Sequence, residues 1–144
     1  MQPVLQQIIR MMVNSIVNPF GLFGGGVTPG VSAVVDKYAF NTAAMTAGTS
    51  LGTSRQLLAA TSTTTIAYFT AGNTGSTTNV TDKYTYTSDV VASGTVTSTK
   101  YGMGGAGNAT KGVFLGGNGG GDSATSLEYT YSGDTTAAGA TSSV

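Results

Sequence analysis

The sequence has no cysteine and no histidine, and only 8% of its residues are charged. Without cysteine, the chain can form neither a disulfide nor a thiolate site. Without histidine, the usual zinc ligand sets and histidine-based catalytic triads are excluded. The six basic residues are scattered singly and are balanced by six acidic residues, so the basic stripe that nucleic-acid binding requires is missing. We expect no nucleic-acid partner, metal or cofactor.

What the sequence does contain is a repeat of 46 and 45 residues, measured between Phe23, Phe69 and Phe114. The three copies read FGGGVTPGVSAVVDKYAF, FTAGNTGSTTNVTDKYTY and FLGGNGGGDSATSLEYTY. A period of this size is typical of stacked or radially arranged supersecondary units. The expected units cover about residues 20–54, 55–99 and 100–144.

Each unit is predicted to form short β-strands, because Thr and aromatic residues alternate between Gly- and Asn-rich turns. The strands are expected at residues 56–61 and 101–106 (first), 21–24, 66–71 and 112–116 (second), 34–40, 80–86 and 126–131 (third), and 45–49, 90–95 and 135–139 (fourth). The first strand therefore occurs twice and the others three times. Tyr38, Tyr84 and Tyr129 are expected to be core residues of the repeat, with stacking on sugar rings as the alternative.

The order of features within a unit carries a family resemblance. A hydrophobic strand ends in a small pair such as Ala71-Gly72, a polar loop and a tyrosine strand follow, then an acid such as Asp89. A basic residue such as Arg55 introduces the next unit. This order resembles the kelch repeat, the blade of a β-propeller, over about residues 20–144, although the kelch tryptophan is missing. It is also similar to degenerate kelch-like repeats of bacteriophage tail-fibre and virion adhesion proteins. The resemblance implies a mainly β fold of short antiparallel strands of the propeller-blade type.

Three units cannot close a ring alone, because propellers usually contain four to eight blades. Two chains sharing a six-bladed ring, a longer ring and a threefold fibre with stacked repeats all remain open. Each alternative leaves strand edges that another chain must cover. We therefore expect a homo-oligomer, a dimer or a trimer.

Residues 1–19 differ in character from the rest of the chain. Leu5, Ile9, Met12 and Ile16 follow the 4-3-4 spacing of a short coiled-coil seam, which predicts an α-helix over residues 3–17. The segment is too short and too polar for a membrane span, and it lacks the basic start and cleavage site of a signal peptide. A helix this short must dock on something, so we expect an anchor or oligomerisation segment. Packing against its own β domain is the alternative.

The acidic residues and the glycine runs indicate no catalytic site. Glycosidases need two carboxylates that face each other, whereas the acids here are distributed by the repeat. Asp36 and Asp82 occupy equivalent positions and are expected to bond local backbone. Asp122 alone is weak evidence for a cation site. The glycine runs lack the lysine and the helix of a phosphate-binding loop, so we expect strand ends and tight turns. The chain is expected not to be an enzyme.

These observations and the resemblance predict a non-enzymatic structural protein of the extracellular virus particle. It would be a bacteriophage fibre or capsid-decorating protein, attached to other virion proteins through its N-terminal helix. Contact with a host-surface glycan would be multivalent, with weak contacts multiplied by the copies in the assembly. The alternative from another class is a carbohydrate-binding propeller lectin assembled from several chains.

Overall fold

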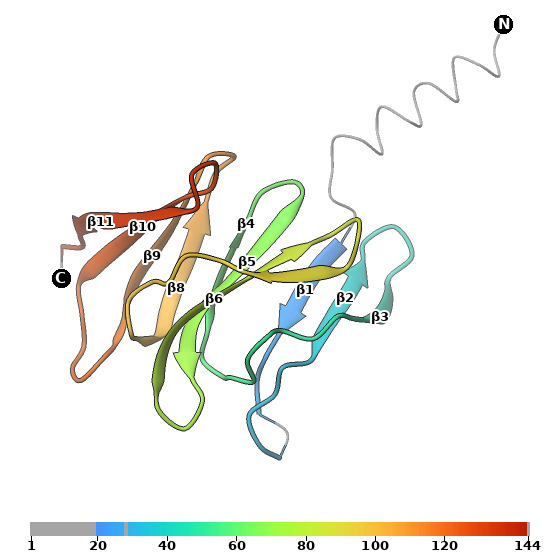
Figure 1. Cartoon of the computed structure of the whole chain (residues 1–144), viewed down its shortest axis with the longest axis horizontal. Coiled ribbons are helices and arrows are strands. Elements are labelled where there is room, and N and C mark those ends of the chain that lie inside the picture. Colours follow the sequence, from blue (N-terminus) through green and yellow to red (C-terminus); the bar gives the residue numbers. More distant parts are fainter. Residues whose placement is uncertain (1–19, 28, 144) are drawn as a thin grey trace, which may run out of the picture.

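The structure, a computed structural model, describes residues 20–27 and 29–143 (Figure 1). The strands in this part of the chain are β1 (Phe20–Gly24), β2 (Val35–Ala39), β3 (Ala44–Gly48), β4 (Ala59–Ser62), β5 (Ile66–Asn73), β6 (Thr77–Thr85), β7 (Val90–Ser93), β8 (Tyr101–Gly107), β9 (Lys111–Asn118), β10 (Thr125–Thr130) and β11 (Thr135–Thr141). Every strand overlaps one of the predicted strands, so the predicted strand positions are confirmed within a few residues at the ends. Alternating Thr and aromatic residues suit such half-buried strands.

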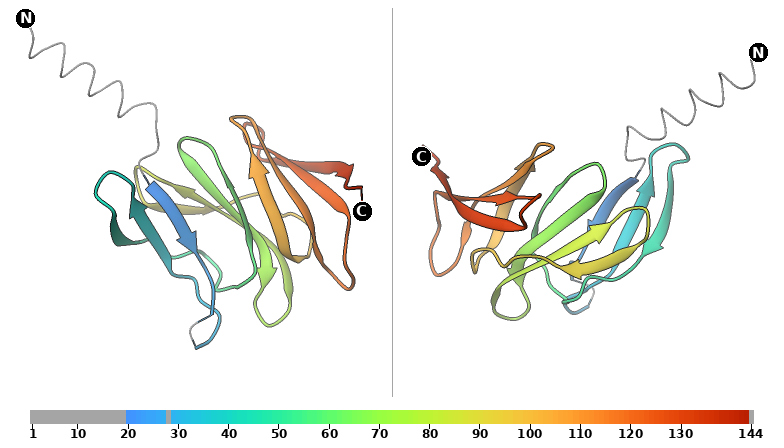
Figure 2. Two further views of the ribbon diagram at one scale, coloured as in Figure 1. Left: turned by 180° about the vertical axis from the view of Figure 1, so that it is seen from behind. Right: turned by 45° about the horizontal axis from the view of Figure 1, so that its top comes forward.

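The strands form three antiparallel sheets in which chain neighbours lie side by side. Sheet 1 contains β1–β3, sheet 2 contains β4–β7 and sheet 3 contains β8–β11. The sheets follow one another along the molecule, with sheet 2 in the middle, and both views of Figure 2 show the same order. Sheets 2 and 3 approach most closely where β4 lies beside β8. A Cβ atom at Gly105 would overlap the carbonyl oxygen of Ala60, so glycine permits this approach.

Two separate cores lie between the three sheets. The core between sheets 1 and 2 contains Val35, Leu51, Ala67, Phe69 and Tyr84. The core between sheets 2 and 3 contains Ala59, Tyr68, Ala71, Met103, Phe114 and Tyr129. Tyr68 and Phe69 are neighbours in β5 but enter different cores, because successive side chains of a strand point to opposite faces. Sheet 2 thus contributes side chains to both cores.

The repeat recurs in backbone hydrogen bonds between neighbouring units and within each unit. The Gly26 amide donates to the carbonyl of Arg55 over 2.9 Å, and one repeat later the Gly72 amide donates to the carbonyl of Lys100 over 2.8 Å. A second bond occurs three times, as Leu51 to Ala33, Thr97 to Asn79 and Ser142 to Ala124. Equivalent sequence positions therefore hold equivalent places in successive sheets.

The expected fold class is wrong in its architecture. The described residues form three separate sheets and no closed propeller. Each unit forms one sheet, which packs against the sheet of the preceding unit. With three units, sheets 1 and 3 lie at opposite ends of the row and do not pair with each other (Figure 1). The described part is all-β and contains no helix, so none there could cross a membrane. The helix predicted over residues 3–17, with its seam of Leu5, Ile9, Met12 and Ile16, lies outside the described residues.

Candidate functional site

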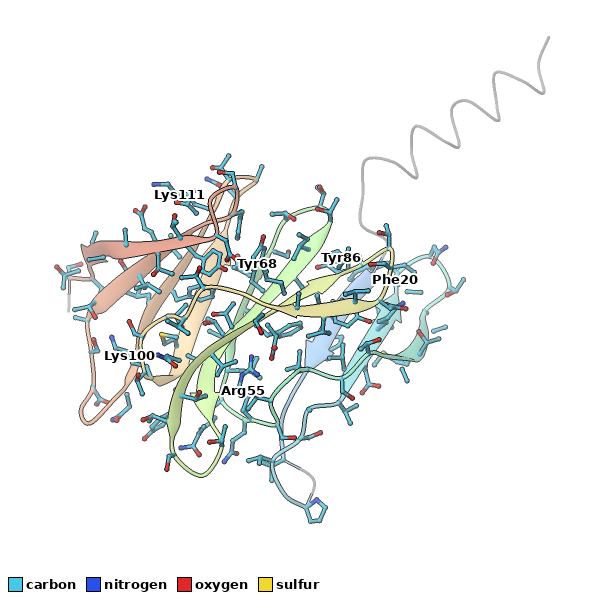
Figure 3. All side chains as sticks on the ribbon, in the orientation of Figure 1. Phe20, Arg55, Tyr68, Tyr86, Lys100 and Lys111 are labelled. Atoms are coloured by element: carbon cyan, nitrogen blue, oxygen red, sulfur yellow. The ribbon has the colours of Figure 1, made fainter. Side chains whose placement is uncertain are left out.

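A groove opens where one end of all three sheets meets. Its walls are Phe20 and Leu22 of β1, Phe40 after β2, the turn at residues 61–64, Tyr86 after β6, and the turn at residues 107–109. The groove has a volume of about 660 Å³. Figure 3 labels Phe20 and Tyr86, which lie on the same side of the molecule, near the start of the first strand.

The chemistry of the groove suits a neutral ligand. Its lining contains aromatic rings, threonine and serine hydroxyls and the amide of Asn108, and includes no charged residue. The Phe40 side chain is 66% exposed and packs edge-on against Tyr38, with ring centroids 5.3 Å apart. The Lys37 ammonium lies 5.1 Å from the centroid of the Phe20 ring, which orients that ring at the rim. Aromatic faces with adjacent hydroxyls can bind a ligand that has both C–H faces and hydroxyl groups.

The charged residues are used elsewhere, in a contact between sheets 1 and 2 that we call tie 1: Lys37, Tyr84 and Asp89. The Lys37 ammonium donates to both carboxylate oxygens of Asp89 over 2.8 Å. The Tyr84 hydroxyl donates to the same carboxylate over 2.6 Å and accepts from the Thr49 amide over 3.2 Å. A Cβ atom at Gly48 would overlap this hydroxyl, so glycine is required beside it. Tie 1 joins β2 to the turn between β6 and β7.

Tie 1 shifts the ionisation of its members. Burial and the hydrogen bond to Asp89 raise the pKa of Tyr84 to about 12. The hydrogen bond from Lys37, and then that from Tyr84, hold the pKa of Asp89 below its usual value. At neutral pH Asp89 is therefore a carboxylate and Tyr84 a neutral phenol. This arrangement holds structure and offers no group poised near neutrality for acid–base catalysis.

The same contact recurs between sheets 2 and 3 as tie 2: Lys83, Tyr129 and Asp134. The Lys83 ammonium lies 2.6 Å from the carboxylate of Asp134, and the Tyr129 hydroxyl donates to that carboxylate. The Thr95 amide donates to the Tyr129 hydroxyl over 3.2 Å, and Gly94 leaves room for it. Burial, followed by the hydrogen bond to Asp134, raises the pKa of Tyr129. Burial acts to raise the pKa of Asp134, but the bonds from Lys83 and Tyr129 outweigh it and lower that pKa.

Neither end sheet has all the residues needed for a third tie: sheet 1 lacks the aspartate, and sheet 3 lacks the lysine. Ala43 holds the place of Asp89 and Asp134, with a matching φ of 53°, but it has no carboxylate. Glu128 holds the place of Lys37 and Lys83, and it pairs with Lys111 of its own sheet over 2.6 Å. The ties therefore connect sheet 1 to sheet 2 and sheet 2 to sheet 3, and the outward faces of sheets 1 and 3 have no equivalent contact among the described residues.

A buried ion pair supports the middle sheet. The Arg55 guanidinium is fully buried and lies 2.6 Å from the carboxylate of Asp82. It also donates to the carbonyls of Phe69, Ala71 and Thr53. Such a pair stabilises only when its remaining donors are satisfied in this way. The expectation that Asp82 bonds local backbone is therefore wrong, because a repeat-positioned arginine reaches it from the preceding connection.

The other residues singled out in the sequence have structural places. Tyr84 and Tyr129 are core residues, as predicted, whereas Tyr38 lies beside the groove at Phe40. Asp122 accepts from the Asn118 amide in a turn. Within residues 20–27 and 29–143, no three His, Cys, Asp or Glu side chains gather to hold a metal ion. The groove residues Phe20, Phe40 and Tyr86 were not assigned from the sequence, because nothing in a linear pattern shows which strand ends converge.

Comparison with known proteins gives no family assignment. No protein-family model matches the chain, and no curated protein is significantly similar to it.

Proposed function

We propose that the chain is a non-enzymatic structural protein of a virus particle, a bacteriophage fibre or capsid-decorating protein. The observation that carries the proposal is the use of charged side chains to join sheets. Tie 1, tie 2 and the Arg55–Asp82 pair engage most of the few charges in the described residues. The resemblance of the repeat to tail-fibre sequences supports the assignment to a virion.

This arrangement suits a body that projects from a particle. Its sheets are joined by ion pairs and apolar cores, and its surface is neutral and rich in hydroxyl groups. We include in the proposal an assembly of two or three copies through the predicted seam of Leu5, Ile9, Met12 and Ile16. Copies held together in this way would multiply weak contacts to a host surface.

The test of particle association uses purified virus particles whose genome carries the gene for the chain. Antibodies raised against residues 20–143 are applied to these particles with a gold label, and the same preparation is analysed by peptide mass spectrometry. Gold at the particle surface together with peptides of this chain is the expected result. Recovery of the chain only in the particle-free fraction would overturn the proposal.

The test of assembly is the solution mass of the full chain by sedimentation. We expect a dimer or trimer that becomes a monomer when Leu5, Ile9, Met12 and Ile16 are all replaced by Ala. A variant with Gln6 and Gln7 replaced by Ala is the control, because these residues lie outside the seam, and it should keep the assembly. A full-length chain that sediments as a monomer would contradict this part of the proposal.

A second candidate, a carbohydrate-binding protein, is favoured by the groove. Its aromatic rings and hydroxyls match the C–H faces and hydroxyl groups of a neutral sugar. The test is a glycan array followed by titration of any bound glycan. Phe40→Ala should weaken binding at least tenfold, while Phe23→Ala should not, because Phe23 is similarly exposed, 63% against 66%, but lies outside the groove. Equal affinities of the two variants, or no glycan bound, would exclude this candidate.

A further inference from the structure

The outward face of sheet 1 carries an acid in an apolar surrounding. Phe23 and Asp36 are directly opposite each other in β1 and β2, and Val34 lies beside them. Phe23 is 63% exposed and Val34 is 54% exposed, and Asp36 is exposed too. Together they line a hollow of about 500 Å³ on this face.

The equivalent face of sheet 2 shows what covers such a position. Phe69 and Asp82 are opposite each other in β5 and β6, in the same register as Phe23 and Asp36. Here the phenylalanine is 2% exposed and the aspartate 3% exposed. Sheet 1 covers the Phe69 side chain, which packs against Val35 and Leu51 in their shared core. The group that binds the buried Asp82 is Arg55, whose guanidinium contacts this carboxylate and the backbone carbonyl of Phe69.

The sequence places an arginine at the matching distance before Asp36. Arg55 precedes Asp82 by 27 residues, and Arg10 precedes Asp36 by 26 residues. Arg10, Arg55 and Lys100 are spaced by 45 residues, so Arg10 lies one position from the place that the 46-residue step between Asp36 and Asp82 would give.

The third unit shows that the basic residue and the acid change together. Leu127 stands where the other units have aspartate, and the basic residue of this unit is Lys100 in place of arginine. Lys100 donates to the hydroxyls of Ser123 and Thr125 instead. An arginine thus precedes each aspartate at this position, by 26 or 27 residues, and a lysine stands before the position that has no aspartate, which links Arg10 to Asp36.

We propose that the outward face of sheet 1 is a docking site for an arginine, and that Arg10 of the same chain occupies it. Its guanidinium pairs with the carboxylate of Asp36 and, by equivalence with Arg55, meets the carbonyls of Phe23 and Gly25. The other five basic residues of the chain all have partners within the described residues. Charge complementarity therefore selects Arg10.

The connection is long enough for this contact. Phe23 follows Phe20 by three residues in β1, so the two residues are roughly 10 Å apart along the strand. Asp36 lies opposite Phe23 in β2. With residues 10–17 in the predicted helix and the last three steps extended, the connection from Arg10 to Phe20 can span roughly 20 Å. Arg10 is not a member of the predicted seam, so those residues stay available for contact with other copies. The inference is independent of the virion assignment.

The test is a double-mutant cycle on the full chain with Arg10→Gln, Asp36→Asn and the double variant. Urea unfolding gives the unfolding equilibrium constant of each. We expect the two changes to be coupled by at least roughly fivefold in that constant. The matched control is Arg10→Gln with Asp122→Asn, because Asp122 lies in a turn of sheet 3, and its coupling should stay within roughly twofold. Absence of coupling between Arg10 and Asp36 would overturn the proposal.

Repeating the cycle over a hundredfold range of protein concentration identifies the source of the arginine. A constant coupling supports Arg10 of the same chain. A coupling that grows with concentration would assign the site to Arg10 of a second copy and would overturn the proposal as stated. Both cycles keep the side chains close to their natural size, and Asp36 is exposed, so the variants should fold; far-ultraviolet circular dichroism checks this.

Discussion

The Lys37 ammonium and the Asp89 carboxylate meet at 2.8 Å although the two residues are 52 positions apart in the sequence. Lys83 and Asp134 repeat this contact over 51 positions, at 2.6 Å. Each pair joins one sheet to the next and is completed by a tyrosine hydroxyl. The chain thus connects its three sheets by one contact used twice, and several mutational predictions depend on it.

Removing the cation of tie 2 should weaken the body moderately. Lys83→Met is expected to lower the free energy of unfolding by about 1 kcal/mol, because the Lys83 and Asp134 side chains are 25% and 37% exposed and solvent screens their attraction. Lys111→Met is the matched control, since Lys111 pairs with Glu128 inside one sheet and is 50% exposed. Urea unfolding of both variants should show the larger loss for Lys83→Met; equal losses would contradict the role of the tie.

Removing Arg55 should be far more damaging. Arg55→Ala leaves the buried carboxylate of Asp82 and three backbone carbonyls without their donor, so we expect a loss of about 3–5 kcal/mol in the free energy of unfolding. Arg55→Lys should lose less than Arg55→Ala but should not restore the natural stability, because an ammonium cannot reproduce the planar fork of the guanidinium. The measurement is urea unfolding followed by circular dichroism. A loss below that of Lys83→Met would disprove the structural importance assigned to Arg55.

A single methyl group should disturb tie 2. Gly94→Ala would push a Cβ atom against the Tyr129 hydroxyl and is expected to cost about 1–3 kcal/mol. Gly104→Ala is the control, because a Cβ atom there has no neighbour within 4 Å, and it should change stability by no more than about 0.5 kcal/mol. Thermal melts of the two variants would reveal the difference. If both substitutions are tolerated equally, the hydroxyl of Tyr129 does not lie against Gly94.

The pH dependence of stability should be two-sided. The pKa values of Asp89 and Asp134 are lowered by folding, so their contribution is present above the unfolded value of about 3.9 and is lost as the pH falls through the folded values. The pKa of Tyr84 is raised to about 12, so its contribution is complete below about pH 10 and is lost as the pH rises toward 12. Urea midpoints from pH 2 to 12 should therefore form a plateau between these limits. Tyr84→Phe should reduce the alkaline loss, and an unchanged alkaline limb would contradict the assignment.

The strand positions could be predicted from the sequence because they follow from alternation and turn residues, which are local properties. Tyr84 and Tyr129 were correctly predicted as core residues, since their repeat positions share the inner face of a strand. The packing of the sheets and the partner of Asp82 could not be read in this way. Arg55 reaches Asp82 from a connection that crosses the preceding sheet, and a linear pattern does not show which connection covers which face.

The ties were within reach of the sequence but were not assigned. Lys37 and Lys83 recur with the repeat, as do Asp89 and Asp134, and the alternation of side chains separates each lysine from the aspartate before it. The sequence does not show which lysine pairs with which aspartate. Each lysine pairs with the aspartate of the following unit, 51 or 52 residues away. This pairing between units depends on how the sheets pack against one another.

The most direct test of the account is native-state hydrogen exchange of the full chain, compared with that of the Lys83→Met variant. If the ties make the three sheets one body, the protected amides of β5, β6, β9 and β10 should exchange with similar free energies in the natural chain. In the variant, β9 and β10 of sheet 3 should exchange more readily than β5 and β6 of sheet 2. Independent exchange of each sheet in the natural chain, unchanged by the substitution, would contradict the claim that its charges serve to hold the sheets together.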